Sequence, residues 1–224
     1  MFKKLIPWIL IVLGCLIIGF AIYLKADTYW NQHKLINQYE KYCESIKNQK
    51  GGPSDNNPEV SLNSNKPTEK KLPDTIMNPD QENEKKEEER KFPKIIGIMS
   101  IPKLDLKVAI GDGSSNGAMR YTVGHFLETA YPGENGNFAV IGHRSYKYGQ
   151  FFNRLDELEK GDSIGIKSGT RTYEYIVTEK IVVNPEDTWV LKTTAKATIT
   201  LITCTPIRIA THRLVVKGVL KKTY

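Results

Sequence analysis

The sequence predicts a mainly β protein, in which residues 93–224 form an eight-stranded, mostly antiparallel β-barrel behind an N-terminal transmembrane helix and a flexible linker. Three observations predict it. Residues 5–24 form a stretch without a charge, and residues 51–91 are rich in Pro, Asn, Glu and Lys. Eight short β-prone segments, separated by turn residues, then follow within residues 95–220.

The uncharged stretch is the expected membrane anchor, because about 20 apolar residues in a helix span a bilayer. Trp8 and Tyr23 lie near its ends, where aromatic rings favour the membrane interface, and two lysines precede it. A cleaved signal peptide is the alternative, but its apolar region is usually about 7–15 residues long. We therefore expect residues 1–27 to be an uncleaved single-pass anchor, with a cytoplasmic N-terminus and an extracellular C-terminal domain.

Residues 28–92 are expected to form a membrane-proximal helix followed by a disordered linker. Apolar residues recur at helical spacing in residues 28–48, and Gly51-Gly52-Pro53 ends the pattern. These apolar residues are Leu35, Ile36, Tyr39, Tyr42, Cys43 and Ile46. The charged run that follows cannot bury enough apolar surface to fold, so we expect a spacer that lifts the C-terminal domain from the membrane.

The strands of the barrel are expected at residues 95–101, 104–110, 121–126, 137–143, 163–167, 172–183, 197–204 and 213–220. A helix is expected at residues 150–158, and a second short helix near residues 114–119. The apolar face of the first helix consists of Phe151, Phe152, Leu155 and Leu158. A domain of this length is sufficient for one sizeable core.

Composition excludes several classes of function. The formal net charge is +7, but no Lys/Arg cluster is interleaved with aromatic residues, so nucleic acid is not an expected partner. No pair of cysteines or Cys/His spacing predicts a metal site, and no cofactor is expected. Cys204 is the only cysteine in residues 93–224 and therefore has no disulfide partner within that domain.

Cys204 ends a strongly β-prone segment and is the candidate nucleophile. A free thiol is only about 3% thiolate at pH 7, so it needs a nearby base or cation. His143 follows an apolar strand at a polar turn, and Arg213 opens the last strand; these residues would supply the proton carrier and the oxyanion partner. His125 and His212 are expected to be structural, and Arg208 is the competing arginine.

The segment Thr200-Leu201-Ile202-Thr203-Cys204 resembles the Thr-Leu-x-Thr-Cys signature of the sortases, the membrane-anchored cysteine transpeptidases of Gram-positive bacteria. Gly142-His143-Arg144 and His212-Arg213-Leu214 are similar to two further blocks of that family. The resemblance covers roughly residues 95–224 and implies a sortase-type eight-stranded barrel.

The resemblance also implies a reaction. Cys204 would attack the Thr–Gly carbonyl of an LPxTG-like sorting signal, Arg213 would stabilise the oxyanion, and His143 would protonate the leaving amine. The resulting thioester would be resolved by an amine of a lipid II-type cell-wall precursor, so that surface proteins become attached to the wall. The expected substrate-binding residues are Thr203, Ile202, Ile141, Val190 and Leu191.

Class D, found in spore-forming bacteria, fits best, because no Asp-Pro-aromatic lid precedes the barrel and no hydrophobic tail follows it. A pilin-polymerising, class C-like enzyme is an alternative, since residues 203–206 and 212–214 also resemble class C. Two further alternatives are a non-catalytic, membrane-tethered module that binds sorting signals and a cysteine endopeptidase that uses water. The linker segment Leu72-Pro73-Asp74-Thr75-Ile76 is either a chance match to a sorting signal or a self-inhibitory mimic.

Overall fold

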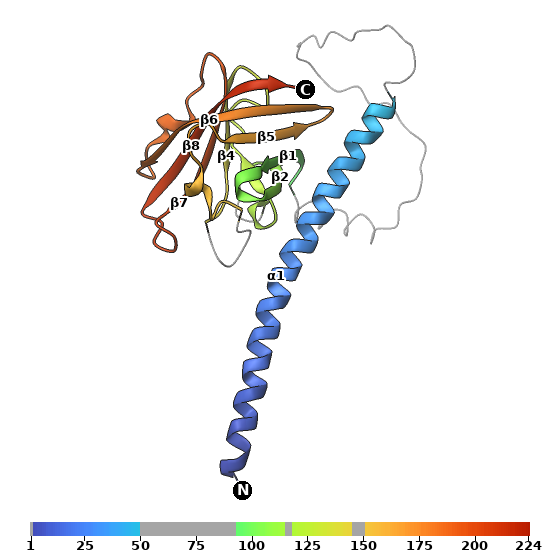
Figure 1. Cartoon of the computed structure of the whole chain (residues 1–224), viewed down its shortest axis with the longest axis vertical. Helices are drawn as coiled ribbons and strands as arrows, with labels where there is room; N and C mark the ends of the chain where they lie inside the picture. Colours follow the sequence, from blue (N-terminus) through green and yellow to red (C-terminus); the bar gives the residue numbers. More distant parts are fainter. Residues whose placement is uncertain (1, 50–92, 115–117, 145–150) are drawn as a thin grey trace, which may run out of the picture.

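A computed structural model describes residues 2–49, 93–114, 118–144 and 151–224 of the chain. These residues form one long helix and a closed eight-stranded barrel, against which one side of the helix lies (Figure 1). The expected linker, with the signal-like segment at residues 72–76, lies outside the described residues.

All eight predicted strands are present, and they close into a barrel in the order β1-β2-β3-β4-β7-β8-β6-β5. Their bounds are β1 (Ile95–Ile101), β2 (Leu106–Asp112), β3 (Val123–His125), β4 (Gly136–Ile141), β5 (Ser163–Ser168), β6 (Arg171–Val183), β7 (Ala197–Thr205) and β8 (His212–Thr223). The connections contain the 3₁₀ helices η1 (Pro102–Leu104), η2 (Ala118–Arg120), η3 (Leu155–Glu157) and η4 (Thr188–Leu191). The pairs β2–β3 and β4–β7 are parallel, and the other neighbouring strands are antiparallel. Closure leaves no unpaired sheet edge to attract other chains.

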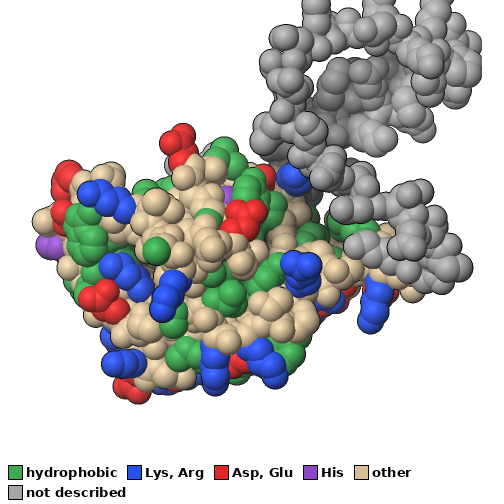
Figure 2. Space-filling view, turned by 90° about the horizontal axis from the view of Figure 1, so that it is seen from above, with side chains coloured by type: hydrophobic (Ala, Val, Ile, Leu, Met, Phe, Trp, Pro, Cys, Tyr) green, Lys and Arg blue, Asp and Glu red, His purple; other side chains and the backbone are tan. Residues whose placement is uncertain are grey.

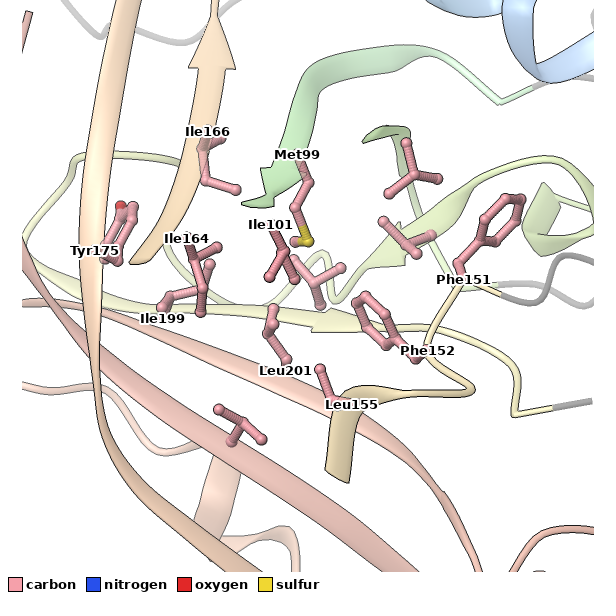
Figure 3. Close-up of a cluster of buried hydrophobic side chains, with 14 of the residues drawn as sticks. Met99, Ile101, Phe151, Phe152, Leu155, Ile164, Ile166, Tyr175, Ile199 and Leu201 are labelled. Atoms are coloured by element: carbon pink, nitrogen blue, oxygen red, sulfur yellow. The ribbon is translucent and has the colours of Figure 1, made fainter. Parts of the chain in front are cut away.

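The barrel interior is filled by aliphatic and aromatic side chains (Figure 3). Alternate residues of each strand point inward, as the period of two predicts. On β7, for example, Ile199 and Leu201 are fully buried in the core. The core side chains from strands that the close-up labels are Met99, Ile101, Ile164, Ile166, Tyr175, Ile199 and Leu201. Fully burying each large apolar side chain contributes about 1.5–3 kcal/mol, so this interior is the main source of stability.

The helix expected at residues 150–158 is shorter than predicted. Residues 151–154 form turns, only Leu155–Glu157 is helical as η3, and residue 150 lies outside the described residues. The four apolar side chains of the predicted face are nevertheless buried in the core. Because an isolated one-turn helix has little stability of its own, packing of these side chains decides the backbone here. Similarly, the short helix expected near 114–119 is seen as η2, with residues 115–117 outside the description.

Helix α1 (Phe2–Gln49) packs against the outside of the barrel through its C-terminal half. Leu35, Ile36, Tyr39 and Cys43 are buried against a patch on β1 and β2 that includes Ile98 and Ala109. These helical residues are four of the six predicted from their spacing, whereas Tyr42 is exposed and Ile46 is only half-buried. Residues 27–43 of the helix are therefore part of one packed unit with the barrel.

Polar contacts fix the position of α1 on the barrel. The Tyr39 hydroxyl donates to the Ile96 carbonyl at 2.9 Å and accepts from the Gly169 backbone N–H at 2.9 Å. Nearer the start of the docked part, the Tyr121 hydroxyl donates to the Asp27 carboxylate at 2.9 Å. Tyr39 thus connects the helix both to β1 and to the turn between β5 and β6.

The structure does not test the predicted membrane anchor. No helix stretch whose residues are all described is long and apolar enough to cross a membrane, and the uncharged stretch includes side chains outside the description. The anchor therefore stays a prediction.

Charged side chains of both signs are interspersed on the barrel face that Figure 2 shows. Ion pairs on the barrel surface include Lys103–Asp162 at 2.9 Å and Arg154–Glu157 at 2.7 Å. Exposed pairs of this kind contribute about 0–1 kcal/mol each. The core and the buried contacts of α1 therefore matter more for stability than these surface pairs.

Replacing Tyr39 with Phe should lower the free energy of unfolding of the full-length chain by about 0.5–1.5 kcal/mol, because the half-buried Gly169 N–H loses its acceptor. Urea unfolding followed by circular dichroism measures this change. Tyr42→Phe is the matched control, since Tyr42 lies on the same helix but is exposed. Equal effects of the two substitutions would show that the helix is not held by the Tyr39 hydroxyl.

Candidate active site

His143 and Cys204 are brought together by the parallel pairing of β4 with β7. In this pair Ile141 lies opposite Ile202, and the backbone N–H of Gly142 continues the ladder by donating to the Ile202 carbonyl at 3.1 Å. Parallel strands end at the same edge of a sheet, so the residue that follows Gly142 lies beside the end of β7. The sheet thus brings together two residues that are sixty-one positions apart in the sequence.

Arg213 is brought to the same edge by the antiparallel pairing of β7 with β8. It lies directly opposite Cys204 in the register. Directly opposed residues have their side chains on one face of the sheet, with Cβ atoms about 4.5–5.5 Å apart. The Arg213 Nη1 atom donates to the carbonyls of Ala210 at 3.1 Å and His212 at 3.0 Å, which holds the guanidinium near the loop between β7 and β8.

Cys204 and Arg213 share the outer face of the barrel. Leu201 belongs to the interior core, whereas Ile202 belongs to a separate cluster outside it. Because side chains alternate along a strand, Cys204 lies on the same outer face as Ile202, and Arg213 lies there with it. The register therefore brings all three sequence-predicted residues to one edge of the barrel, with Cys204 and Arg213 on its outer face.

The surroundings of Cys204 and His143 suit reactive groups. Cys204 is a free thiol and is half-buried, so a peptide can reach it. Burial lowers the pKa of His143, because a desolvated imidazolium is less stable than a hydrated one. The glycine before His143 is required by space, since a Cβ at Gly142 would lie 2.6 Å from Cδ2 of Phe152.

An apolar surface continues from the trio along the same outer face. It is a cluster in which Val183, Val190, Ile202 and Val215 are buried. The half-buried side chains packed against it are Phe126, Ile141, Ile181 and Leu191. Helix η4, in the connection from β6 to β7, supplies Val190 and Leu191. Four of the five predicted substrate-binding residues, Ile141, Val190, Leu191 and Ile202, therefore lie in this one cluster.

Thr203 does not line this surface, contrary to the sequence-based expectation. Its side chain is fully buried, and its hydroxyl donates to the Gly142 carbonyl at 2.7 Å. The physical reason is the alternation along β7, which turns Thr203 away from the face that carries Ile202 and Cys204. Thr203, which directly precedes Cys204, is instead bonded to Gly142, which directly precedes His143.

Asn137 is a residue that sequence reasoning missed. It is buried, its Nδ2 donates to the Val190 carbonyl at 2.9 Å, and its Oδ1 accepts from the Thr200 hydroxyl at 2.7 Å. It thereby attaches η4 to the outer face of β4 and β7. The available signal was a polar residue at the start of an otherwise apolar strand, which could equally have been a solvent-facing position.

The other two histidines considered from the sequence, and the competing arginine, lie in different surroundings. His125 is fully buried, and its ring nitrogens lie 3.1 Å from an Asp112 carboxylate oxygen and 3.1 Å from the Ala130 carbonyl, so it has the structural role expected of it. His212 and Arg208 are exposed near the connection from β7 to β8. Within the described residues, no group of three or more His, Cys, Asp or Glu side chains is placed to hold a metal ion.

Comparison with known proteins identifies relatives of the barrel and of the whole chain. The sortase domain model matches residues 99–221. Sortase D of Bacillus subtilis (strain 168) is 30% identical over 207 residues, which are 91% of this chain and 90% of that protein. A solved Clostridium perfringens Sortase D5 transpeptidase aligns with a TM-score of 0.54 and 35% identity, over 65% of this chain and 90% of that one. A pilus-related Sortase C of Group B Streptococcus aligns with a TM-score of 0.55 and 33% identity, over 58% of this chain and 68% of that one. With its domain match, its full-length relative and its closed eight-stranded barrel, the chain belongs to the sortase family.

Proposed function

We propose that the chain is a class D-like sortase that cleaves an LPxTG-like sorting signal between Thr and Gly and transfers the acyl part to an amine. Membership of the family makes the chain a sortase-type transpeptidase that acts on sorting signals. The finer assignment to class D is supported by the two Sortase D relatives, each of which is matched over about nine-tenths of its length. The residue roles are supported by the register of β4, β7 and β8.

Acylation is the first half of the proposed reaction. The Cys204 thiolate attacks the carbonyl carbon of the Thr–Gly bond, and the carbonyl oxygen becomes an oxyanion near the guanidinium of Arg213. As the tetrahedral intermediate collapses, the C–N bond breaks and the His143 imidazolium gives its proton to the departing amine of Gly. The product is a thioester between Cys204 and the Thr carboxyl group.

Deacylation reverses the roles. An incoming amine attacks the thioester carbonyl, neutral His143 accepts the amine proton, and the C–S bond breaks to regenerate the thiolate. We propose that the amine belongs to a lipid II-type cell-wall precursor, so that surface proteins are attached to the wall. Water would give hydrolysis instead, which is the endopeptidase alternative.

One observation carries the proposal. The pairing of β4 with β7 and of β7 with β8 brings a free cysteine, a histidine and an arginine to one edge of the sheet, with the cysteine and the arginine directly opposite each other. The half-buried Ile141 and Leu191 of the apolar cluster support recognition of a signal with apolar Leu and Pro positions, because a bound peptide would remove these apolar side chains further from water.

The proposed location is the outer face of a Gram-positive cell membrane, with residues 1–27, the N-terminal part of the chain, as the single-pass anchor. The uncharged residues 5–24 and the lysines before them support it. Several large side chains in this stretch are also exposed, including Leu16 at 64% and Phe20 at 63%. Exposed apolar side chains in such density favour an apolar environment.

A class C-like, pilin-polymerising role is the second candidate, and the alignment with a pilus-related Sortase C supports it. The two roles differ in the acceptor. Supplying the chain with a sorting-signal peptide and either an oligoglycine amine or a lysine side-chain amine distinguishes them, because a polymerising enzyme would prefer the lysine of another protein subunit.

Incubation of the full-length chain with LPxTG-type peptides should give a thioester adduct on Cys204, detected by mass spectrometry of the peptide that contains this residue. Cys204→Ala should abolish adduct and cleavage, because it removes the nucleophile, whereas a non-catalytic binding module would be unaffected. Added oligoglycine should be ligated to the acyl fragment. Cleavage that persists in Cys204→Ala, or no adduct with any peptide of the panel, contradicts the proposed function.

The pH profile of kcat/KM should rise at a pH below the titration midpoint of His143 in the urea-unfolded chain. Burial lowers the pKa of His143, so the folded imidazole loses its proton at lower pH than the unfolded one. Activity rises as the Cys204–His143 pair loses its first proton, so the acid limb follows this lowered pKa. Nuclear magnetic resonance titration of His143 in the folded and unfolded chain provides the comparison. An acid limb of the kcat/KM profile at or above the pH at which His143 titrates in the unfolded chain would contradict the catalytic role of His143.

Asn137→Asp should raise KM for the sorting-signal peptide by about fivefold or more, with a smaller effect on kcat. The substitution replaces the amide donor with an oxygen that faces the Val190 carbonyl, and a buried acceptor without a donor costs about 1–3 kcal/mol. Thr200→Val, which leaves the bond to Val190 in place, should act in the same direction but less strongly. Alkylation of Cys204 by iodoacetamide is the control and should keep its rate. A fall in kcat with unchanged KM contradicts this role.

A further inference from the structure

Arg144 is a buried arginine with three occupied nitrogens. Its side chain is only 6% exposed. Its Nε donates to the Asn153 carbonyl at 3.2 Å, its Nη1 to the Thr205 hydroxyl at 3.1 Å, and its Nη2 pairs with an Asp156 carboxylate oxygen at 2.7 Å. Burying a guanidinium costs desolvation free energy unless it is paired and hydrogen-bonded. The three contacts of Arg144 offset this cost and hold its partners in place.

The contacts of Arg144 join the neighbours of the two candidate catalytic residues. Arg144 directly follows His143, and Thr205 directly follows Cys204. On the other side of the pair, Thr203 donates to Gly142, which directly precedes His143. The His143 segment and the Cys204 segment are therefore bonded to each other through side chains both before and after the reacting residues.

These bonds lie away from the reacting face. Thr203 and Thr205 alternate with Cys204 along β7, so their side chains point to the opposite side of the strand. Arg144 reaches Thr205 on that side, and its charge is balanced by Asp156. Its contribution is therefore to geometry, and not a contact with the peptide or the thiol.

We propose that Arg144 is a positioning residue, which fixes the approach of His143 to Cys204 by holding Thr205, Asn153 and Asp156 at once. The planar guanidinium can satisfy three partners in fixed directions, whereas a lysine ammonium presents a single point charge on a flexible stem. The expected change in kcat rests on the proposed function. The expected effect on how closely the His143 imidazole approaches the Cys204 thiol does not depend on that function.

Arg144→Lys tests the inference in the full-length chain. It should lower kcat about 10- to 100-fold and leave KM within about twofold, because a small misplacement of reacting groups affects the chemical step most. Thr205→Val removes the hydroxyl at the other end of the same bond and should act in the same direction. Arg154→Lys is the matched control, since Arg154 pairs with Glu157 in the same connection but is 56% exposed; it should leave both constants unchanged.

A second measurement separates positioning from general stability. The alkylation rate of Cys204 is followed against pH by mass spectrometry of the Cys204 peptide, in the wild type, Arg144→Lys and His143→Ala. Because the charge of a nearby imidazole changes the pH at which the thiol reacts, the Arg144→Lys profile should move toward that of His143→Ala.

Two results would overturn the inference. One is a wild-type alkylation profile in Arg144→Lys, with activity lost only in proportion to the unfolded fraction measured by circular dichroism. The other is a wild-type profile in His143→Ala, which would mean that no close pair exists for Arg144 to hold. If the wild type gives no thioester with any peptide, the proposed function fails, and the alkylation profiles still decide the role of Arg144.

Discussion

The parallel pairing of β4 with β7 is the constraint on which the site depends. The two strands are far apart in the sequence. Their inner faces pack in the barrel core, and η4 packs against their outer faces. A slip of one residue would turn Ile202 inward and Leu201 outward, which the apolar interior strongly disfavours. The packing that stabilises the barrel thus also fixes which residue stands beside His143, so stability and chemistry depend on one register.

Local patterns predicted the presence of the eight strands and four of the six residues on the packed face of α1. The roles of the three candidate catalytic residues stay a prediction. Apolar and polar residues alternate along a strand that has one buried face, which makes such a strand visible in the sequence. For β1, both predicted ends, residues 95 and 101, agree with the structure. Local patterns could not predict which strands are neighbours, because register is decided by contacts across the whole barrel. Thr203 illustrates this limit. A threonine could line a substrate groove, but the Thr203 side chain points to the side of β7 opposite to Cys204 and bonds to Gly142. The helix predicted at residues 150–158 is also reduced to η3, because core packing and not its own periodicity decides the backbone there.

The residues that organise the site are polar side chains whose partners are other parts of the chain. Asn137 attaches η4, Thr203 joins β7 to Gly142, and Arg144 joins three segments at once. Asn and Arg are usually solvent-exposed, so the sequence alone does not predict a buried role for Asn137 or Arg144. In the folded chain each is buried and satisfied, which is the condition under which a polar group rigidifies its surroundings instead of weakening them. Preorganisation of this site therefore comes largely from residues that do not take part in the chemistry.

The docking of α1 has a consequence for the height of the catalytic edge above a membrane. Asp27, which accepts a bond from Tyr121 of the barrel, is three residues beyond the uncharged stretch, and three helical residues rise about 4.5 Å. If that stretch is embedded, the barrel lies against the lipid headgroups, and its distance from them is set by a rigid helix. Residues 50–92 then do not determine the reach of the enzyme. Insertions and deletions there would be nearly neutral in evolution, while the spacing between residues 24 and 27 would be under strict selection.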